Sequence, residues 1–278
     1  MRRAAWKSAA WTAAGASILG ALVLASLAAP EFLSRPNLAE SALLPFTGGP
    51  ILGTDIRGIP ITEYALQGAG VVTMPALVSA LVVAFLAIVA GLARCAAISW
   101  ADTAIQLFSE LVGALPRLVV VLVVALAMPA EWRSLFPIGV TWALLAAPGA
   151  MDEAASTAGR LGGAKFVEAL RAHGFTATRI YLYHIVWLNL RGVIVRQSAD
   201  IMMQVVFLEI ALSYLAESQQ QPSLTHQDST FSWARLLYDG YTAIVGGLPL
   251  FHELFVGITL VAATAFMAQA FRRGAQAR

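Results

Sequence analysis

Residues able to carry out chemistry are few in this chain, and their spacing does not bring them together. The four histidines stand in four different segments: His173, His184, His226 and His252. The pair His252-Glu253 lacks the second histidine that a zinc-protease helix needs. Ser213 and Ser232 have no base beside them, and the single Cys95 excludes an internal disulfide and a multi-cysteine metal site. We therefore expect no catalytic site and no metal site.

A nucleotide site is also missing from the sequence. No G-x-x-x-x-G-K-[ST] loop is present, so the chain is not expected to bind ATP by itself. If it moves a solute, the energy has to come from a partner or from an ion gradient.

The composition indicates a membrane protein. The 278 residues are 59% hydrophobic and 12% charged, with a mean hydropathy of +0.73, whereas a soluble domain carries about 25% charged residues. The apolar residues come in runs near the ~20 that cross a bilayer as a helix. We expect one all-α polytopic domain over residues 1–278, in contact with lipid and without a nucleic-acid partner.

Six spans are predicted along the chain. The first helix lies within residues 1–29, an extracytoplasmic cap follows over 30–70, and the core helices occupy 71–271. The approximate spans are Trp6 to Ala29, Val71 to Ala93, Asp102 to Met128, Leu135 to Met151, His184 to Ala216 and Leu250 to Phe271. The fourth is short and contains Pro137 and Pro148. The first also suits a cleaved signal peptide, but its apolar run is long for one, which favours retention.

Basic residues predict the orientation. If the N-terminus is cytoplasmic, the segments on the cytoplasmic side of the membrane hold most of the arginines and lysines. The outside pieces hold only Arg35, Arg57, Arg133 and Arg235. This asymmetry supports six spans with both termini in the cytoplasm. The outer segment Pro30 to Gly70 contains five prolines and is predicted to be irregular. The other, Glu217 to Pro249, is either a surface loop or a lip that meets an external partner.

A basic island from Lys165 to Asn189 is the main place where this chain can touch a soluble partner. Phe166, Ala169, Leu170 and His173 recur at the spacing of one helix face, with Glu168 and Arg171 elsewhere on the helix. Gly174 is placed to end that helix. Thr176 or Thr178 can cap a second helix. Physical reasoning alone leaves an interfacial helix on anionic lipid slightly ahead of a protein groove.

The residues of this island resemble the EAA loop of bacterial ABC-importer permeases, in particular the dipeptide/oligopeptide/nickel group. The matching positions are Glu168, Ala169, Arg171, Ala172, Gly174, Arg179, Ile180, His184, Ile185 and Asn189. Leu170 stands where the family has a second alanine, and Val186-Trp187 replaces its Leu-Pro. Without that proline, the start of the fifth span should be less kinked.

Further boxes are similar to the same group and occur in the same order from about Leu52 to Leu250. In ILGTDIRG, the matching residues are Leu52, Gly53, Thr54, Asp55 and Gly58. Asp102, Glu110 and Pro116 keep the spacing of the third span, with Glu110 in place of an aspartate. Two later segments, around Glu209 and around Trp233, resemble the family's E-x-x-L-S-F-L and P-S-W-G boxes.

The resemblance implies an importer subunit of the bacterial cytoplasmic membrane that has no cofactor of its own. Its partners would be a second, homologous permease, two cytoplasmic ATPases that hold ATP and Mg²⁺, and an extracytoplasmic binding protein that delivers a short peptide or related solute. The coupling loop would cover about 155–183. Phe166, Ala169 and Leu170 would supply the buried ATPase contact, and Glu168 and Arg171 polar contacts. His173 is also assigned to ATPase coupling, and Gly174 would let the chain turn back to the membrane.

Four polar residues inside the spans have both a structural and a translocation-path interpretation. An ionised Glu209 costs at least ~2.5–3.5 kcal/mol on insertion scales, so it should face the bundle. Arg117 is a solute contact, a partner of Glu110 or Glu209, or a snorkelling residue. Arg196 and Gln204 share a helix face and line the path or pack against the partner permease. A gradient-driven transporter or channel subunit is the alternative function.

Overall fold

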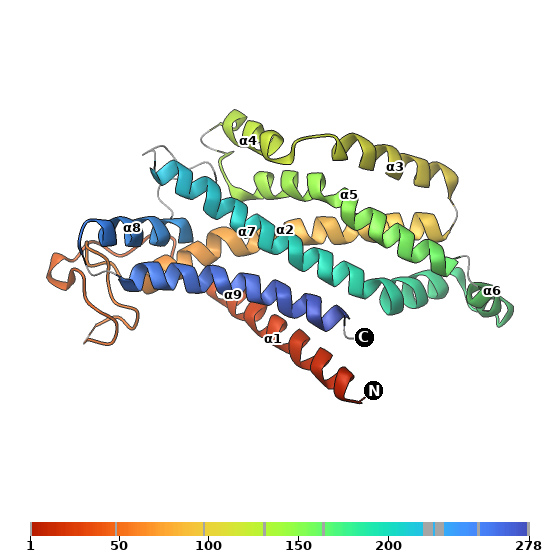
Figure 1. Ribbon diagram of the computed structural model, residues 1–278, viewed down its shortest axis with the longest axis horizontal. Helices are drawn as coiled ribbons and strands as arrows, with labels where there is room; N and C mark the ends of the chain where they lie inside the picture. Colours follow the sequence, from red (N-terminus) through yellow and green to blue (C-terminus); the bar gives the residue numbers. More distant parts are fainter. Residues whose placement is uncertain are drawn as a thin grey trace.

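The structure is a computed structural model that describes residues 2–47, 49–96, 98–129, 132–162, 165–218, 225, 231–248 and 251–276. Within these residues the regular structure is helical, with one isolated β-bridge between Thr54 and Pro60. The all-α class predicted from composition is therefore confirmed. The helices run roughly along one long axis and form an elongated bundle (Figure 1).

The helical elements follow one another closely along the chain. In order they are α1 (Arg2–Leu27), η1 (Leu38–Glu40), α2 (Ile61–Cys95), α3 (Ser99–Gly113), α4 (Arg117–Ala127), α5 (Leu135–Gly162), α6 (Lys165–Ala172), η3 (Arg179–Leu190), α7 (Arg191–Ser218), α8 (Trp233–Val245) and α9 (Phe251–Gln276). The element η3 is a π-helix that continues into α7.

Five described helices are long and apolar enough to cross a membrane, or up to six if one bent pair is a single span. The five are Ser8–Leu27, Ile61–Cys95, Leu135–Leu161, Arg179–Ala216 and Phe251–Ala275. They correspond to the first, second, fourth, fifth and sixth predicted spans. The fourth, expected to be short, has 27 residues because its helix continues past Met151 to the end of α5.

The third predicted span, Asp102 to Met128, is not one continuous helix. It consists of α3 and α4, which meet at an angle of 80°. Pro116 lies at the break and has no N–H to continue the ladder of hydrogen bonds. The last turn of α3 closes instead with the Ala114 N–H donating to the Glu110 carbonyl at 3.2 Å. Hydropathy alone does not reveal this break, because both halves are apolar.

The cap is shorter than the predicted 30–70, because α2 already begins at Ile61. Its first turns are buried beneath the cap, and Ile61, Tyr64 and Gln67 are almost inaccessible. Between α1 and α2 the described chain is irregular apart from the short η1, as its prolines predicted. Of the second outer segment, 233–245 form α8, while most of its polar stretch lies outside the described residues.

The two ends of the bundle carry different parts of the chain. Figure 1 shows both termini in the half of the bundle from which α6 projects, and the cap and α8 at the opposite end. The described helices thus alternate in direction along the chain in the way the six-span prediction requires, if α3 and α4 count as one crossing. The two ends are hereafter called the terminal end and the cap end.

Alanine-rich rows hold the centre of the bundle together. On α2, Ala76, Ala80, Ala87 and Ala90 are buried at helical spacing, and α5 presents a matching row. The α5 row consists of Ala143, Ala147, Ala150, Ala154 and Ala158. Because alanine has no side chain beyond Cβ, the two backbones approach closely, as is typical of helix pairs in membranes. We call this contact the α2–α5 seam.

A larger side chain in the seam should destabilise the fold. Ala147→Leu adds three carbons to a fully buried position, and overpacking of this kind costs about 1–3 kcal/mol. We expect the midpoint of thermal unfolding in detergent to fall. Ala21→Leu, on the exposed face of α1, should leave it nearly unchanged. Equal midpoints of thermal unfolding for the two variants would contradict the close packing proposed for the α2–α5 seam.

Candidate functional site

The short helix α6 stands at the terminal end and finishes in a glycine turn. The Gly174 N–H donates to the Arg171 carbonyl at 2.9 Å, and the Phe175 N–H donates to the Leu170 carbonyl at 3.1 Å. This pair of bonds is a Schellman motif, which needs a left-handed residue after the helix. Gly174 has φ +80° and supplies it. The predicted role of Gly174 in ending the helix is confirmed.

The face that α6 turns toward its own chain includes a residue that the sequence analysis did not single out. Val167 is only 4% exposed and belongs to the hydrophobic core, and Leu170 packs partly against that core. Val167 and Leu170 are three residues apart, so they share one face. The only sign of this inward position in the sequence was an apolar valine within the predicted helix. The side chain of Phe166, the first of the predicted contact residues, lies outside the described residues.

Much of the surface of α6 is open. Glu168, Ala169, Arg171 and His173 are all exposed, and the His173 Nδ1 lies 2.7 Å from the Ala169 carbonyl. The predicted contact residues therefore divide into two groups. Leu170 faces partly inward, and the other four form an accessible surface of mixed polarity.

Polar and aromatic contacts brace α6 against the start of the fifth span. The Arg171 Nη2 donates to the Tyr181 hydroxyl at 2.8 Å. The Arg179 guanidinium lies over the Phe175 ring at 4.7 Å, and that ring meets His184 edge-on. These contacts link α6 and the turn after it to η3 in addition to the backbone connection. Thr176, rather than Thr178, accepts from the first N–H of η3.

In the cap, the segment ILGTDIRG (51–58) places Asp55 at the centre of a hydrogen-bond network, here called the Asp55 hub. The Asp55 Oδ1 accepts from the N–H groups of Arg57 and Ile59 at 2.9 and 2.8 Å. Its Oδ2 accepts from the Tyr64 hydroxyl at 2.8 Å and from the Arg57 Nε at 3.2 Å. Burial lowers the pKa of Arg57, but its interactions with Tyr64 and Asp55 more than offset this and raise it. The guanidinium therefore stays charged.

Glycines and Thr54 complete this hub. Gly53 and Gly58 have φ +82° and +77°, and a Cβ on Gly58 would overlap the Asn37 carbonyl. The Thr54 hydroxyl donates to the Glu40 carbonyl and accepts from the Leu43 N–H at 2.9 Å. Gly53, Thr54, Asp55 and Gly58 thus hold the cap against the start of α2, and the Asp55 carboxylate accepts four hydrogen bonds.

Glu209 is a link between segments at the cap end. It is fully buried, and its Oε1 accepts from the Ser213 hydroxyl at 2.7 Å. That hydroxyl lies 2.8 Å from the Thr225 hydroxyl, which belongs to the segment between α7 and α8. The geometry agrees with the structural interpretation of Glu209.

Arg196 and Gln204 both join α7 to α5. Arg196 forms an ion pair with Glu153, whose Oε2 also accepts from the Gln197 amide at 2.6 Å. Gln204 accepts from the Trp142 indole N–H at 3.0 Å. Each side chain therefore has a partner within its own chain, and the two bridges keep α5 and α7 in register.

Arg117 lies apart from these residues. It is the first residue of α4 and is exposed. In the part of the chain that the structure describes, it forms no ion pair with Glu110 or Glu209. The snorkelling interpretation and the solute-contact interpretation both remain compatible with this position.

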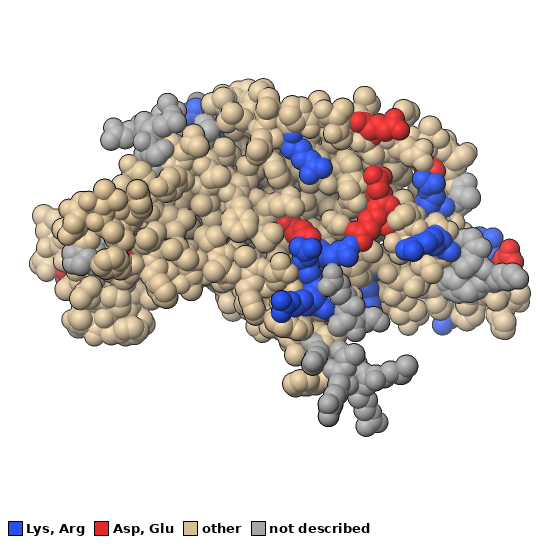
Figure 2. Space-filling model, viewed as in Figure 1, with Lys and Arg blue, Asp and Glu red and all other residues tan. Residues whose placement is uncertain are grey.

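Charged side chains gather toward the terminal end. Figure 2 shows Lys, Arg, Asp and Glu concentrated in that half of the visible face. Two further ion pairs connect helices: Arg94 with Asp102 at 2.8 Å and Arg272 with Asp200 at 3.6 Å. The concentration agrees with the arginine asymmetry counted in the sequence.

No family model matches this sequence, and a search of curated proteins finds no match either. The described residues contain no group of three or more His, Cys, Asp or Glu side chains arranged to hold a metal ion.

The turn at Gly174 is open to a direct test. Alanine at a left-handed position costs about 1–2 kcal/mol, so Gly174→Ala should loosen the junction between α6 and η3. We expect faster amide hydrogen exchange over residues 167–178. Gly149→Ala, at an exposed helical position of α5 with open space around it, should leave that exchange unchanged. Unchanged exchange in Gly174→Ala would show that the turn does not depend on glycine.

A second test compares the stability contributed by Arg196, which pairs with Glu153, with that of the exposed Arg117. Arg196→Gln leaves Glu153 without its charged partner, and losing a charge-assisted contact costs roughly 1.5–3 kcal/mol. The midpoint of thermal unfolding should fall in Arg196→Gln and stay within error in Arg117→Gln. If Arg117→Gln is as destabilised as Arg196→Gln, the bridge is not what stabilises α7 on α5.

Proposed function

We propose that this chain is a membrane-spanning permease subunit of a bacterial ABC importer for short peptides or related small solutes. The multi-pass helical architecture fits this function. Its main support is the ordered set of motif similarities from Leu52 to Leu250, with the coupling loop at their centre. The proposed location is the bacterial cytoplasmic membrane, with the terminal end on the cytoplasmic side.

The structural feature that suits α6 to coupling is its exposed surface combined with contacts that hold it to the rest of the chain. A partner ATPase would grip the exposed face formed by Glu168, Ala169 and His173. The Gly174 turn and the Arg171–Tyr181 hydrogen bond would pass its movement to η3. A helix attached only by a flexible loop would move without passing its movement to η3.

From η3 the movement would continue into the transmembrane bundle. The fifth span is a continuous helical segment from Arg179 to Ala216. It is bridged to α5 through Glu153 and through Trp142. The fifth span and α5 would therefore rock together as one body between outward-open and inward-open states.

The remaining partners follow from this scheme. A second permease, most simply a distinct homologue, would complete the translocation path. Two ATPases would hold and hydrolyse ATP with Mg²⁺. An extracytoplasmic binding protein would approach the cap end, where the Asp55 hub gives the cap a defined shape. A gradient-driven transporter would need none of the ATPase contacts.

Coupling to an ATPase is the decisive prediction. Ala169→Glu places a charge in the middle of the open face of α6, where it should disrupt docking without disturbing the chain's own core. In complexes purified from the native membrane and placed in proteoliposomes, we expect solute-stimulated ATP hydrolysis to fall about tenfold or more. Thr103→Glu, which is exposed on α3 away from this face, is the matched control.

Two results would contradict the assignment. One is transport by the purified chain in proteoliposomes that contain no ATPase and carry an ion gradient. The other is unchanged stimulation in an Ala169→Glu complex that still contains its ATPase.

A further inference from the structure

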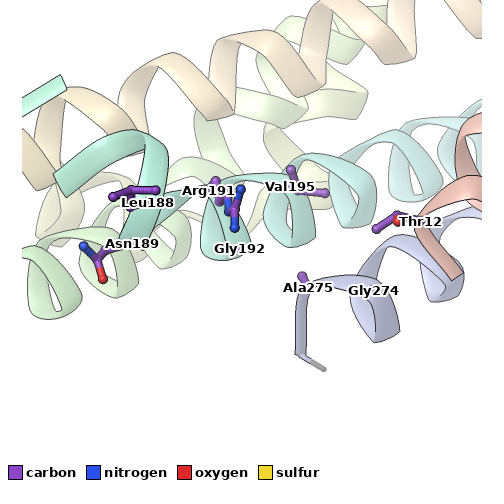
Figure 3. A pocket seen from close by; sticks show the side chains of 8 residues that line it. All are labelled: Thr12, Leu188, Asn189, Arg191, Gly192, Val195, Gly274 and Ala275. Atoms are coloured by element: carbon purple, nitrogen blue, oxygen red, sulfur yellow. The ribbon is translucent and has the colours of Figure 1, made fainter. Parts of the chain in front are cut away.

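A groove opens between α1, α7 and α9 at the terminal end. Its volume is about 290 Å³, and Thr12, Arg191 and Gly274 are among the residues that line it. Figure 3 shows Thr12 on α1, Arg191 on α7 and the position of Gly274 on α9, so segments far apart in the sequence line the groove. The α6 surface plays no part in it.

Arg191 brings a positive charge to this groove that the described protein does not neutralise. An arginine cannot lose its proton at ordinary pH. The other arginines of α7 and α9 are engaged: Arg196 pairs with Glu153, Arg272 pairs with Asp200, and Arg273 lies over Trp11 at 4.6 Å. Among the described residues, Arg191 has no ion pair and no side-chain hydrogen bond, and it is half-buried. An anion from outside the protein is the complement that this site lacks.

The shape of the groove depends on two glycines. Gly274 lies so close to α1 that a Cβ there would come within 2.3 Å of the Thr12 side chain. A Cβ on Gly192 would meet only the Ala275 carbonyl, at 3.6 Å, so the space beside Arg191 is open. A small anionic group therefore has room next to the guanidinium.

Apolar side chains flank the charge along the helix. Leu188 and Val195 line the same groove on the turns before and after Arg191, and they are 43% and 38% exposed. The groove thus presents one cation between two exposed apolar side chains, at the end of membrane-spanning helices. That pattern suits a molecule with an anionic head and hydrocarbon chains better than a free ion.

We propose that this groove binds the phosphate headgroup of an anionic phospholipid, with Arg191 at the phosphate and the acyl chains along Leu188 and Val195. Arginine recognises phosphate through paired hydrogen bonds, and basic pockets between transmembrane helices are suited to lipid headgroups. The bound lipid would occupy the groove between the 188–195 segment and the packed ends of α1 and α9. This inference does not depend on the proposed transport function.

Native mass spectrometry of the full chain in detergent tests the ligand class. Three probes separate the contributions: phosphatidylglycerol, which has phosphate and chains, diacylglycerol, which has chains only, and inorganic phosphate. We expect a retained adduct with phosphatidylglycerol alone. An equal adduct with diacylglycerol, or displacement of phosphatidylglycerol by millimolar inorganic phosphate, would overturn the lipid-headgroup assignment.

Two variants test the place of binding. Arg191→Gln removes the charge and should weaken phosphatidylglycerol binding about tenfold. Gly192→Leu keeps the charge but fills the groove and should weaken binding to a similar extent. The matched control is Arg160→Gln, which removes an exposed arginine at the same end but outside the groove. Binding that survives both groove variants, or that falls equally in Arg160→Gln, would overturn the proposal.

Discussion

Close packing of α2 against α5 is the constraint on which the rest of the molecule depends. In a bilayer, burying apolar surface between helices gains little, because lipid tails are as apolar as leucine. Association then depends on contact between well-matched surfaces, and the alanine rows of the α2–α5 seam provide it. The seam leaves α2 at the centre of the bundle, with α7 and α1 also packed against it. The peripheral α3 and α4 pack mainly on α5.

The buried polar residues of the bundle mainly link one segment to another through hydrogen bonds and ion pairs. Asp55 fastens the cap to the start of α2, Glu209 fastens the segment before α8 to α7, and Glu153 fastens α7 to α5. A hydrogen bond in a low-dielectric setting is strong, and an unpaired polar group there is costly. The two surfaces for which a function is proposed, the open surface of α6 and the groove beside Arg191, lie outside these links.

Much of the fold could be predicted because hydropathy and arginine placement are local properties. The positions of five spans followed from hydropathy, the irregular cap from its prolines, and the role of Gly174 from the preference for glycine after a helix. The break at Pro116 was missed because both flanking segments are apolar, although the proline itself was a signal. The early start of α2 was missed because Tyr64 and Gln67 are buried by the cap and not by lipid. The inward role of Val167 depended on how α6 sits against the core.

The sequence by itself determined that this is a helical membrane protein with one amphipathic helix able to meet a soluble partner. Those properties follow from composition and from spacing along one helix. Only the tertiary structure decided which polar residues already have a partner within the chain. Arg196 and Arg191 are five residues apart and look equivalent in the sequence, yet one faces Glu153 of α5 and the other faces an open groove. The difference arises because a partner 43 residues away in the chain is brought close by packing, which no local pattern records.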